Sequence, residues 1–351
     1  MIETDCKDIQ LLLHRMKKIL VTGGLGYIGS HTVVELQAAG YDVVVIDNLN
    51  NATLEVKDRI ESISGRSFDL MVADVCDKDK MEQLFTHHSF DGVIHFAAYK
   101  AVGESVENPV MYYQNNIIGL INLLRAMEKH QVTNLIFSSS CTVYGAAKNL
   151  PVTEQTPIQD AESPYGTTKI IGEELIQDYA KHKDFKTVLL RYFNPVGAHP
   201  SAQIGELPNG TPSNLVPYIT QTAAGIRKQL VIHGDDYNTP DGTCIRDYIH
   251  VVDLAEAHVK ALMYAAEMNQ ASAVFNVGRG QGTSVMQVVE AFERRCNLKL
   301  NYTIGPRRPG DVEQIFADTT KINQQLNWQP KYNLEEMMNH AWLWQKNLMT
   351  S

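Results

Sequence analysis

Residues 17–29 of this 351-residue chain read KKILVTGGLGYIG, and this segment sets the fold class. The apolar run 19–21 predicts a buried strand, and the pattern over 28–39 predicts a helix that ends at Gly40. The glycines between them fit two spacings, Gly24-Gly26-Gly29 or Gly23-Gly26-Gly29. Glycine permits a tight turn and close approach of a pyrophosphate to the backbone, and a helix start offers free N–H groups. The segment therefore predicts a dinucleotide site.

An acidic residue follows at the expected distance. The apolar run 42–46 predicts a second strand, and Asp47 ends it, 21 residues after Gly26. A carboxylate there can accept hydrogen bonds from both ribose hydroxyls and would repel a 2′-phosphate. The next residues, Asn48, Leu49 and Asn50, include no arginine, so NAD is favoured over NADP. A glycine-rich turn in an α/β protein that binds no nucleotide is the alternative.

The rest of the first half repeats the alternation of apolar runs and helical patterns. This alternation predicts an α/β fold of the Rossmann type, with a doubly wound parallel sheet. Further strands are expected at 68–72, 92–96, 134–138 and 187–192. Further helices are expected at 54–63, 80–86, 111–129 and 165–181.

The composition and the hydrophobic pattern of the sequence change near Pro195. Residues 197–212 are rich in Gly, Pro and Ser and predict a loop. Beyond it, helical patterns at 252–266, 284–294 and 334–344 alternate with short strands at 230–232 and 273–277. We expect residues 16–195 to form the dinucleotide-binding domain, and residues 196–351 to form mainly a smaller C-terminal α/β lobe for the substrate.

The first 15 residues do not fit this scheme. Met16 directly precedes the first predicted strand, so we expect residues 1–15 to be a dispensable extension. Acidic residues stand where a signal peptide should be basic, and its apolar core would be too short. A short amphipathic helix lying on the fold is the alternative.

The net charge and the cysteine content exclude several classes of partner and binding site. A formal net charge of −9 argues against a nucleic acid or an anionic membrane as partner, and a phosphate-bearing ligand would need a local basic pocket. No apolar run is long enough to span a bilayer. The five cysteines are scattered without a CxxC pair, so we expect no metal site, no disulfide framework and a cytoplasmic location.

Tyr165 and Lys169 stand four residues apart in a predicted helix and therefore share one face. A lysine ammonium beside a phenol favours the phenolate, which can act as a base. Ser140 closes the predicted strand before them, where strand ends of such a sheet line the ligand crevice. Together these residues suggest redox chemistry on an alcohol, although a serine in that place is by itself more often a turn residue.

Longer motifs add to this pattern. They are DNL at 47–49, HFAA at 95–98, KAVGES at 100–105, RYFNPVGAHP at 191–200, DGT at 241–243, RDYIH at 246–250 and PRRPGD at 306–311. With these motifs the chain resembles the extended short-chain dehydrogenase/reductase family from Lys17 to about Trp344. More closely, it is similar to the members that epimerise UDP-hexoses at C4.

The resemblance implies a reaction and its residues. Tyr165 would take the proton from the sugar 4-OH, Ser140 would hydrogen-bond that oxygen and could relay the proton, and Lys169 would hold the nicotinamide ribose and lower the pKa of Tyr165. Hydride would pass from C4 to NAD+, and the 4-keto sugar would turn over and take it back on its other face. The implied activity is interconversion of UDP-glucose and UDP-galactose.

The resemblance also implies binding residues. Cofactor contacts would fall at Gly23, Gly26, Tyr27, Ile28, Gly29, Asp47, Asn48, Asn51, Asp74, Val75, Phe96, Ala97, Lys100, Asn115, Tyr165, Lys169 and Tyr192. Substrate contacts would fall at Lys100, Ser140, Tyr165, Asn194, Asn214, Arg246, Arg308, Asp311 and Ile315. Arginine forks suit a pyrophosphate on an acidic protein. Without the resemblance, a solvated loop at 307–308, a helix cap at Asp74 and backbone bonds at Asn115 and Asn194 are the alternatives.

Four residues depart from the family pattern. Cys141 replaces a usual alanine, and we interpret it as a small packed residue rather than a catalytic thiol. Ala98 replaces a common glycine, and His233 replaces a phenylalanine that often flanks the uracil. Ile315 stands where tyrosine is associated with plain hexoses and Cys, Ser or Gly with N-acetylhexosamines. Activity on UDP-GlcNAc and UDP-GalNAc, in addition or instead, therefore stays open.

Other functions are weaker interpretations. A nucleotide-sugar 4,6-dehydratase needs a carboxyl pair near the catalytic hydroxyl, whereas Cys141 and Thr142 follow Ser140. A non-catalytic NAD-binding regulator is disfavoured because Ser140, Tyr165 and Lys169 are all present. The family often dimerises through two long helices, so we expect a homodimer that uses 111–129 and 165–181.

Overall fold

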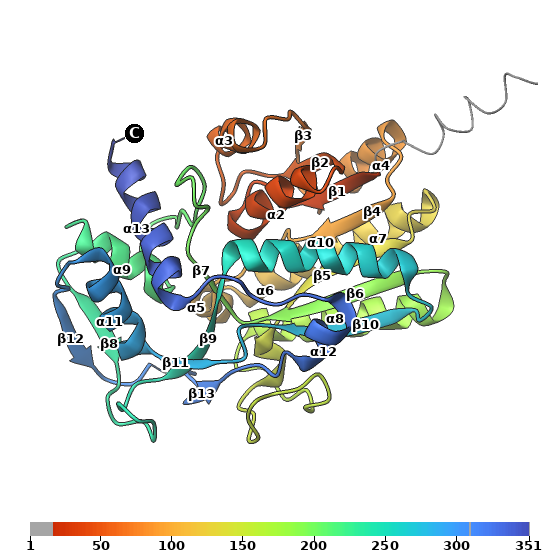
Figure 1. Cartoon of the computed structure of the whole chain (residues 1–351). Coiled ribbons are helices and arrows are strands. Elements are labelled where there is room, and N and C mark those ends of the chain that lie inside the picture. Colours follow the sequence, from red (N-terminus) through yellow and green to blue (C-terminus); the bar gives the residue numbers. More distant parts are fainter. Residues whose placement is uncertain (1–16, 309, 351) are drawn as a thin grey trace, which may run out of the picture.

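A parallel seven-stranded sheet forms the centre of the computed structural model, which describes residues 17–308 and 310–350 (Figure 1). Its strand order is β10-β6-β5-β4-β1-β2-β3, so the chain moves outward from β1 in both directions. The strands are β1 (Lys18–Thr22), β2 (Asp42–Asp47), β3 (Asp69–Val72), β4 (Gly92–His95), β5 (Asn134–Ser140), β6 (Lys186–Tyr192) and β10 (Ser272–Val277). The predicted Rossmann-type α/β fold is confirmed. The expected extension at 1–15 lies outside the described residues.

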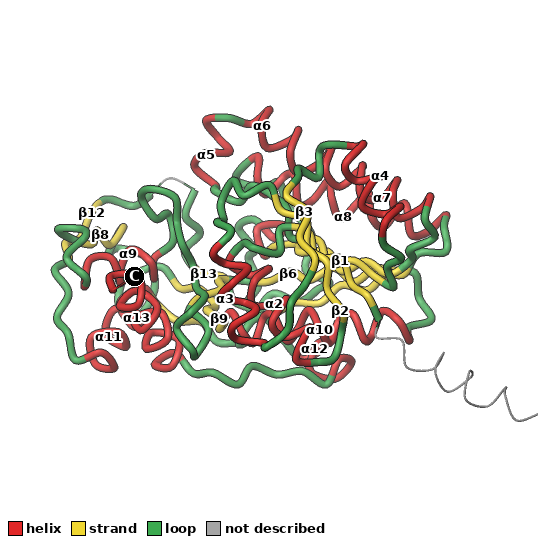
Figure 2. Tube along the Cα trace, turned by 90° about the horizontal axis from the view of Figure 1, so that it is seen from above, coloured by secondary structure: helices red, strands yellow, loops and turns green. Residues whose placement is uncertain are grey.

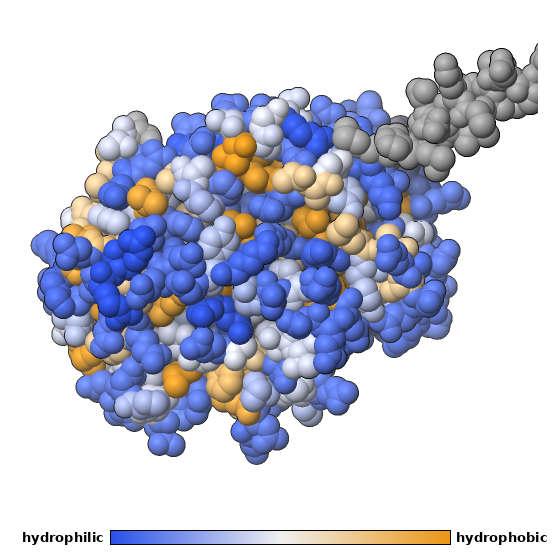
Figure 3. Space-filling model, in the orientation of Figure 1, coloured by the Kyte–Doolittle hydropathy of each residue, from blue (hydrophilic) through white to orange (hydrophobic). Residues whose placement is uncertain are grey.

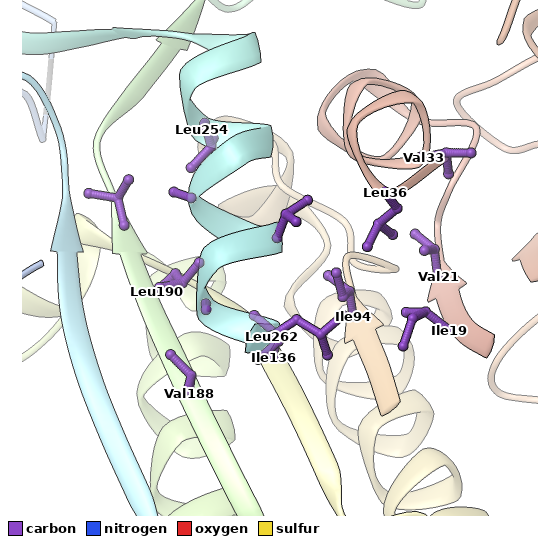
Figure 4. Packing of buried hydrophobic residues seen from close by; sticks show 14 of the residues in the cluster. Ile19, Val21, Val33, Leu36, Ile94, Ile136, Val188, Leu190, Leu254 and Leu262 are labelled. Carbon is purple, nitrogen blue, oxygen red and sulfur yellow. The ribbon is translucent and has the colours of Figure 1, made fainter. Parts of the chain in front are cut away.

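Helices cover both faces of this sheet, which is why its central strands are almost continuously apolar. One face packs against α2 (Tyr27–Ala38), α3 (Glu55–Ser64), α10 (Val251–Glu267) and α12 (Thr320–Leu326), and Figure 4 shows part of this core. The other face packs against α4 (Lys78–His87), α7 (Gly119–Lys129) and α8 (Pro164–His182). The buried apolar surface on both faces is the main stabilising contribution.

A smaller unit lies beside the carboxyl ends of the sheet (Figure 2). One small sheet holds β7 (Asn194–Val196), β9 (Ile245–His250), β11 (Gly282–Ser284) and β13 (Gln314–Ile315). A second holds β8 (Leu230–His233) and β12 (Tyr302–Gly305). Three helices pack with them around a separate core: α9 (Leu215–Ala223), α11 (Val285–Cys296) and α13 (Leu334–Thr350).

The chain passes between the two units more often than a single division at 195 predicts. We placed the helix at 252–266 and the strand at 273–277 in the smaller lobe, and this placement was wrong. α10 covers the large sheet, and β10 pairs with β6 as its edge strand. A short strand of this kind looks the same in either sheet, because its partner lies far away in sequence. The binding roles of the two units remain proposals.

The expected single helix over 111–129 is interrupted. It consists of α6 (Pro109–Tyr113), a π-helical turn η1 (Gln114–Ile118) and α7, and a short α5 (Val102–Glu107) precedes it. In η1 the Asn116 side chain exchanges hydrogen bonds with the backbone of Tyr99 and donates to Thr168 on α8. Such π-helical turns are frequent at functional sites.

Charged and polar side chains cover most of the face shown in Figure 3, and the apolar residues on it are scattered. Among residues 17–308 and 310–350, no helix combines the length and apolar character that crossing a membrane requires.

Candidate active site

A cavity of about 630 Å³ lies at the carboxyl ends of the sheet strands, between the two units. Sixteen of the expected cofactor residues line it, which are Gly23, Gly26, Tyr27, Ile28, Gly29, Asp47, Asn48, Asn51, Val75, Phe96, Ala97, Lys100, Asn115, Tyr165, Lys169 and Tyr192. Of the expected substrate residues, Lys100, Tyr165 and Asn214 line it as well. Residues that are far apart in sequence therefore meet around one cavity.

The loop between β1 and α2 has no room for a side chain at Gly23, and neither has the first turn of α2 at Gly29. A Cβ on Gly29 would lie 2.2 Å from the carbonyl oxygen of Gly23, and one on Gly23 would lie 2.9 Å from the Ala97 nitrogen. Gly23 also has a φ of +68°, which favours glycine. Helix α2 starts after Gly26 without a side-chain cap, so its first N–H groups face the cavity unpaired by a side chain. This loop fits a bound pyrophosphate.

Asp47 stands at the end of β2, beside the glycine loop. Its two carboxylate oxygens accept the N–H groups of Leu25 (3.0 Å) and Leu49 (2.9 Å), and each keeps a further lone pair. Burial raises the pKa of this carboxyl, and the two N–H groups oppose the shift. Asp47 can therefore accept a ribose hydroxyl while it also holds the loop.

Asp74 does not line the cavity. It accepts hydrogen bonds from the Cys76 N–H (2.7 Å) and from the Asn48 side chain (2.8 Å). Burial raises the pKa of Asp74, but these hydrogen bonds outweigh it and hold the pKa below its usual value. Its position indicates that Asp74 orients Asn48, which does line the cavity.

Tyr165 and Lys169 lie on the first turns of α8, which begins after the capping residue Ser163. Both are almost fully buried, at 7% and 5% exposure, and the Lys169 Nζ lies 5.8 Å from the Tyr165 ring centre. Lys169 donates to the carbonyl of Ser138 at 2.7 Å. Burial lowers the pKa of Lys169 to about 8, so this lysine is mostly charged at neutral pH. The predicted juxtaposition on one helix face is present.

The phenol of Tyr165 is not acidified by the protein. Burial raises its pKa to about 12, and a hydrogen bond with the Ser140 side chain opposes this shift. Ser140 ends β5 and accepts the N–H of Thr142, at the start of the 3-10 turn η2 (Cys141–Tyr144). It does not line the cavity around the glycine loop, but it lies beside Tyr165. Burial also raises the pKa of the Cys141 thiol to about 12, which disfavours a reactive thiolate.

The two expected substrate arginines meet on one carboxylate. Arg308 donates to both Asp311 oxygens (2.8 and 3.1 Å), and Arg246 on β9 reaches the same group at 3.4 Å. The Asp311 hydrogen bond raises the pKa of Arg308. Asp311, which the family resemblance assigns to the substrate, is therefore a partner of both guanidinium groups.

The remaining substrate candidates also lie in the smaller unit or at its edge. Ile315 in β13 pairs with Arg246 in β9, and its side chain belongs to a small apolar cluster with Tyr144 and Phe193. Asn194 begins β7 beside Tyr248. Asn214 caps the start of α9 by position, and its side chain donates to Glu206 at 2.7 Å. Asn214 lines the large cavity, whereas six other substrate candidates do not, which are Ser140, Asn194, Arg246, Arg308, Asp311 and Ile315.

The 197–214 loop closes the cavity from the side of the smaller unit, and sequence reasoning missed its role. Glu206 pairs with Lys100 at 3.0 Å, and Asn209 donates to the carbonyl of Asn50 and the side chain of Asn51. Trp344 on α13 donates to the carbonyl of Glu206. Residues 201–213 of this loop carry no motif, and only their contacts reveal which of them matter.

No cluster of three or more His, Cys, Asp or Glu side chains with metal-binding geometry occurs within residues 17–308 and 310–350.

Known proteins are similar over nearly the whole chain. The model of a family described as GDP-mannose 4,6 dehydratase matches residues 20–341. UDP-glucose 4-epimerase 2 of Arabidopsis thaliana is 47% identical over 335 residues, which cover 94% of this chain and 95% of that relative. The UDP-glucose 4-epimerase of Bacillus subtilis is 48% identical over 94% of this chain and 97% of its own.

A solved structure is also similar over nearly the whole chain. The UDP-glucose-4-epimerase of Stenotrophomonas maltophila, with bound NAD and formylated UDP-arabinopyranose, is 46% identical and has a TM-score of 0.93 over 96% of this chain and 99% of its own.

Proposed function

Because the chain belongs to the UDP-glucose 4-epimerases, within the extended short-chain dehydrogenase/reductase family, we propose that it interconverts UDP-glucose and UDP-galactose with NAD as its cofactor. The observation that carries this function is the buried pair Tyr165 and Lys169 in the wall of the cavity that also holds the glycine loop. This arrangement brings a base for an alcohol and a dinucleotide site together.

The chain's own residues bind the sugar oxygen and move its proton. Tyr165 takes the proton of the 4-OH and returns it, and Ser140 holds the same oxygen by a hydrogen bond. Lys169 stays mostly charged at neutral pH, 5.8 Å from the centre of the phenol ring, and we assign it to the nicotinamide ribose. NAD+, when bound, would supply the hydride acceptor and a positive charge that favours the phenolate. We assign the loop 23–29 and Asp47 to the cofactor, because both line the cavity and the first N–H groups of α2 have no side-chain cap.

The smaller unit provides the positive charge that the UDP group needs on an acidic protein. We assign Arg246 and Arg308 to the pyrophosphate, with Asp311 as the group that holds both guanidiniums in place. Asn214 and Asn194 lie near the same unit and would contact the nucleotide or the sugar.

Two further properties belong to this proposal. The exposed apolar side chains on α5, α6 and η1, which include Val106, Val110 and Ile118, support a homodimer through this face and α8. We also place the enzyme in the cytoplasm, because the four described cysteines are free thiols, as in a reducing compartment.

The test is conversion of UDP-galactose by the purified protein without added NAD, with the epimers separated by chromatography. UDP-glucose is the expected product. A parallel reaction with UDP-GalNAc measures whether Ile315 closes the sugar pocket to an N-acetyl group, and little conversion is expected with this β-branched side chain. No conversion of UDP-galactose, even after NAD is supplied, would refute the proposed function.

A further inference from the structure

A buried ion pair lies directly behind the catalytic residues. Glu173 and Arg191 are 1% and 4% exposed, and the guanidinium donates to both carboxylate oxygens, with the shortest contact at 2.5 Å. Burying two charges is costly, and an apolar pair of similar size is often as stable. A contribution to stability is therefore a weak explanation for the presence of this ion pair. The residues around it suggest a different role.

The pair joins three elements of the site. Glu173 is four residues after Lys169 and eight after Tyr165, so the three side chains share one face of α8. From strand β5, the Ser139 hydroxyl donates to the same Glu173 carboxylate on α8. Ser139 is the residue directly before Ser140, so this bond ties the end of β5 to the helix that carries the base and the lysine.

The arginine extends the connection along the sheet. Arg191 is in register with Ser139 on β5 and with Asn276 on β10, so the three form one row across neighbouring strands. Arg191 donates to the Tyr144 hydroxyl at 3.1 Å, and Tyr144 donates to Asn276 at 2.6 Å. Tyr144 ends the turn η2 that starts just after Ser140. Ser140 is therefore anchored from both sides.

We propose that Glu173 and Arg191 are positioning residues, which hold Ser140, Tyr165 and Lys169 in one arrangement for the epimerisation. This role rests on the proposed function. Neither Glu173 nor Arg191 lines the cavity. The pair acts through Ser139, Tyr144 and helix α8. An error of about 1 Å in the placement of reacting groups can cost up to roughly 100-fold in rate.

The carboxylate also acts on the charge of Lys169. The titratable groups that face Lys169 are Tyr165 and Glu173 on its own helix and His95 on β4. Burial lowers the pKa of His95 to about 3, so this histidine is neutral. Glu173 raises the pKa of Lys169 against burial. Removing the carboxylate would lower this pKa further and leave the Arg191 cation without its partner.

The decisive variant is Glu173→Gln. We expect kcat with UDP-galactose to fall roughly 10- to 100-fold, while KM changes little because the UDP-binding arginines lie in the other unit. The fall of kcat at alkaline pH should begin at a lower pH than in the wild type, since Lys169 loses its proton more easily. Ser139→Ala, which keeps both charges, should lower kcat in the same direction by a smaller factor.

Two further variants separate positioning from stability. Glu173→Met with Arg191→Met removes both charges together, so its thermal midpoint should lie above that of Glu173→Gln while kcat stays low. Asp253→Asn is the matched control: this buried carboxylate on α10 accepts the N–H groups of Lys331 and Tyr332 and not a group of β5 or α8. Its loss should lower the thermal midpoint and leave kcat and its pH profile unchanged.

A double variant whose kcat recovers together with its stability would overturn the positioning role. So would a Glu173→Gln enzyme with an unchanged kcat and pH profile, if the wild type epimerises UDP-galactose. A wild type that does not epimerise would refute the proposed function instead, and this role with it.

Discussion

Tyr165 is the residue at which the protein and its cofactor must act together. Burial raises the pKa of its phenol to about 12, and the neighbouring Lys169 is itself buried, with a pKa lowered to about 8. Below pH 8 the phenol is protonated and the ammonium is mostly charged, whereas between pH 8 and pH 12 the phenol is still protonated and the lysine is mostly neutral. The phenolate is therefore accessible near neutral pH only where a further positive charge, such as that of NAD+, lowers the pKa of Tyr165. With that charge in place, the activity should rise with pH as the phenolate forms and fall where Lys169 loses its proton.

The first prediction concerns this phenol. Tyr165→Phe removes the proton acceptor and should lower kcat by about 10²- to 10⁴-fold, the usual contribution of a positioned acid or base. The measurement is the turnover of UDP-galactose, with the NAD content of the protein determined in parallel. Tyr179→Phe on the same helix is the control, because the Tyr179 hydroxyl donates to Glu128 at the surface. Equal activity of both variants would contradict the role of Tyr165.

Among the elements, α13 is attached to the rest of the molecule by a buried histidine. His250, the N-cap of α10, accepts the Val252 N–H at one ring nitrogen and hydrogen-bonds His340 of α13 with the other (3.0 Å). Tyr332 stacks on the same ring. Burial lowers the pKa of His250 to about 2, and nearby histidines, His340 first, add to this shift.

The second prediction follows from this shift. Because the unfolded state binds a proton near pH 6.5 and the folded state does not, the stability from His250 is complete above that pH and is lost as the pH falls below it. In His250→Asn, which keeps a capping acceptor, the loss of unfolding free energy between pH 7 and pH 5 should be smaller than in the wild type by about 2 kcal/mol.

Denaturant unfolding at the two pH values measures this difference. Comparing the variant with the wild type removes the contribution of other buried groups such as Asp253. Burial raises the pKa of Asp253 to about 6, so its effect on the pH dependence of stability has the opposite sign. His87→Asn, at an exposed position on α4, should leave the difference unchanged. An identical pH dependence in His250→Asn and wild type would show that His250 is not the group responsible.

The 197–214 loop is the element that retains the cofactor in our interpretation. Asn209 joins this loop to Asn50 and Asn51 on the opposite side of the cavity, at 2.9 and 3.0 Å. The third prediction is that Asn209→Ala releases NAD up to roughly 30-fold faster, because two hydrogen bonds of about 1 kcal/mol each are lost. Exchange of bound against labelled NAD measures the rate.

Asn301→Ala is the control for this experiment, since the Asn301 side chain bonds the carbonyl of Lys228 in the smaller unit. It should leave the exchange rate as it is. If Asn209→Ala exchanges NAD no faster than Asn301→Ala, the loop does not retain the cofactor.

For the whole molecule, the fourth prediction concerns assembly. Ile118 on η1 is 45% exposed among other apolar side chains, and a charge there would be buried at the proposed dimer face. Sedimentation of the wild type should give twice the mass of one chain, and Ile118→Glu should give the mass of one. Ile226→Glu, at another exposed apolar position, should stay dimeric. A monomeric wild type at micromolar concentration would refute the dimer.

Much of the larger unit follows from local features of the sequence. The first strand, the crowded glycine loop and the start of α2 are neighbours in the chain, and Tyr165 and Lys169 share a face because a helix repeats about every four residues. Asp47 ends its strand where the spacing predicted it. These features depend on turns and periods, which a sequence displays directly.

The tertiary structure decided what depends on distant partners. It joined β10 to the large sheet, interrupted the helix at η1 and placed Glu206 against Lys100 across 106 residues. It also aligned Ser139, Arg191 and Asn276 in one row behind the catalytic residues. Strand register and ion pairing of this kind arise when separate segments pack together, so their energies have no local signature in the sequence.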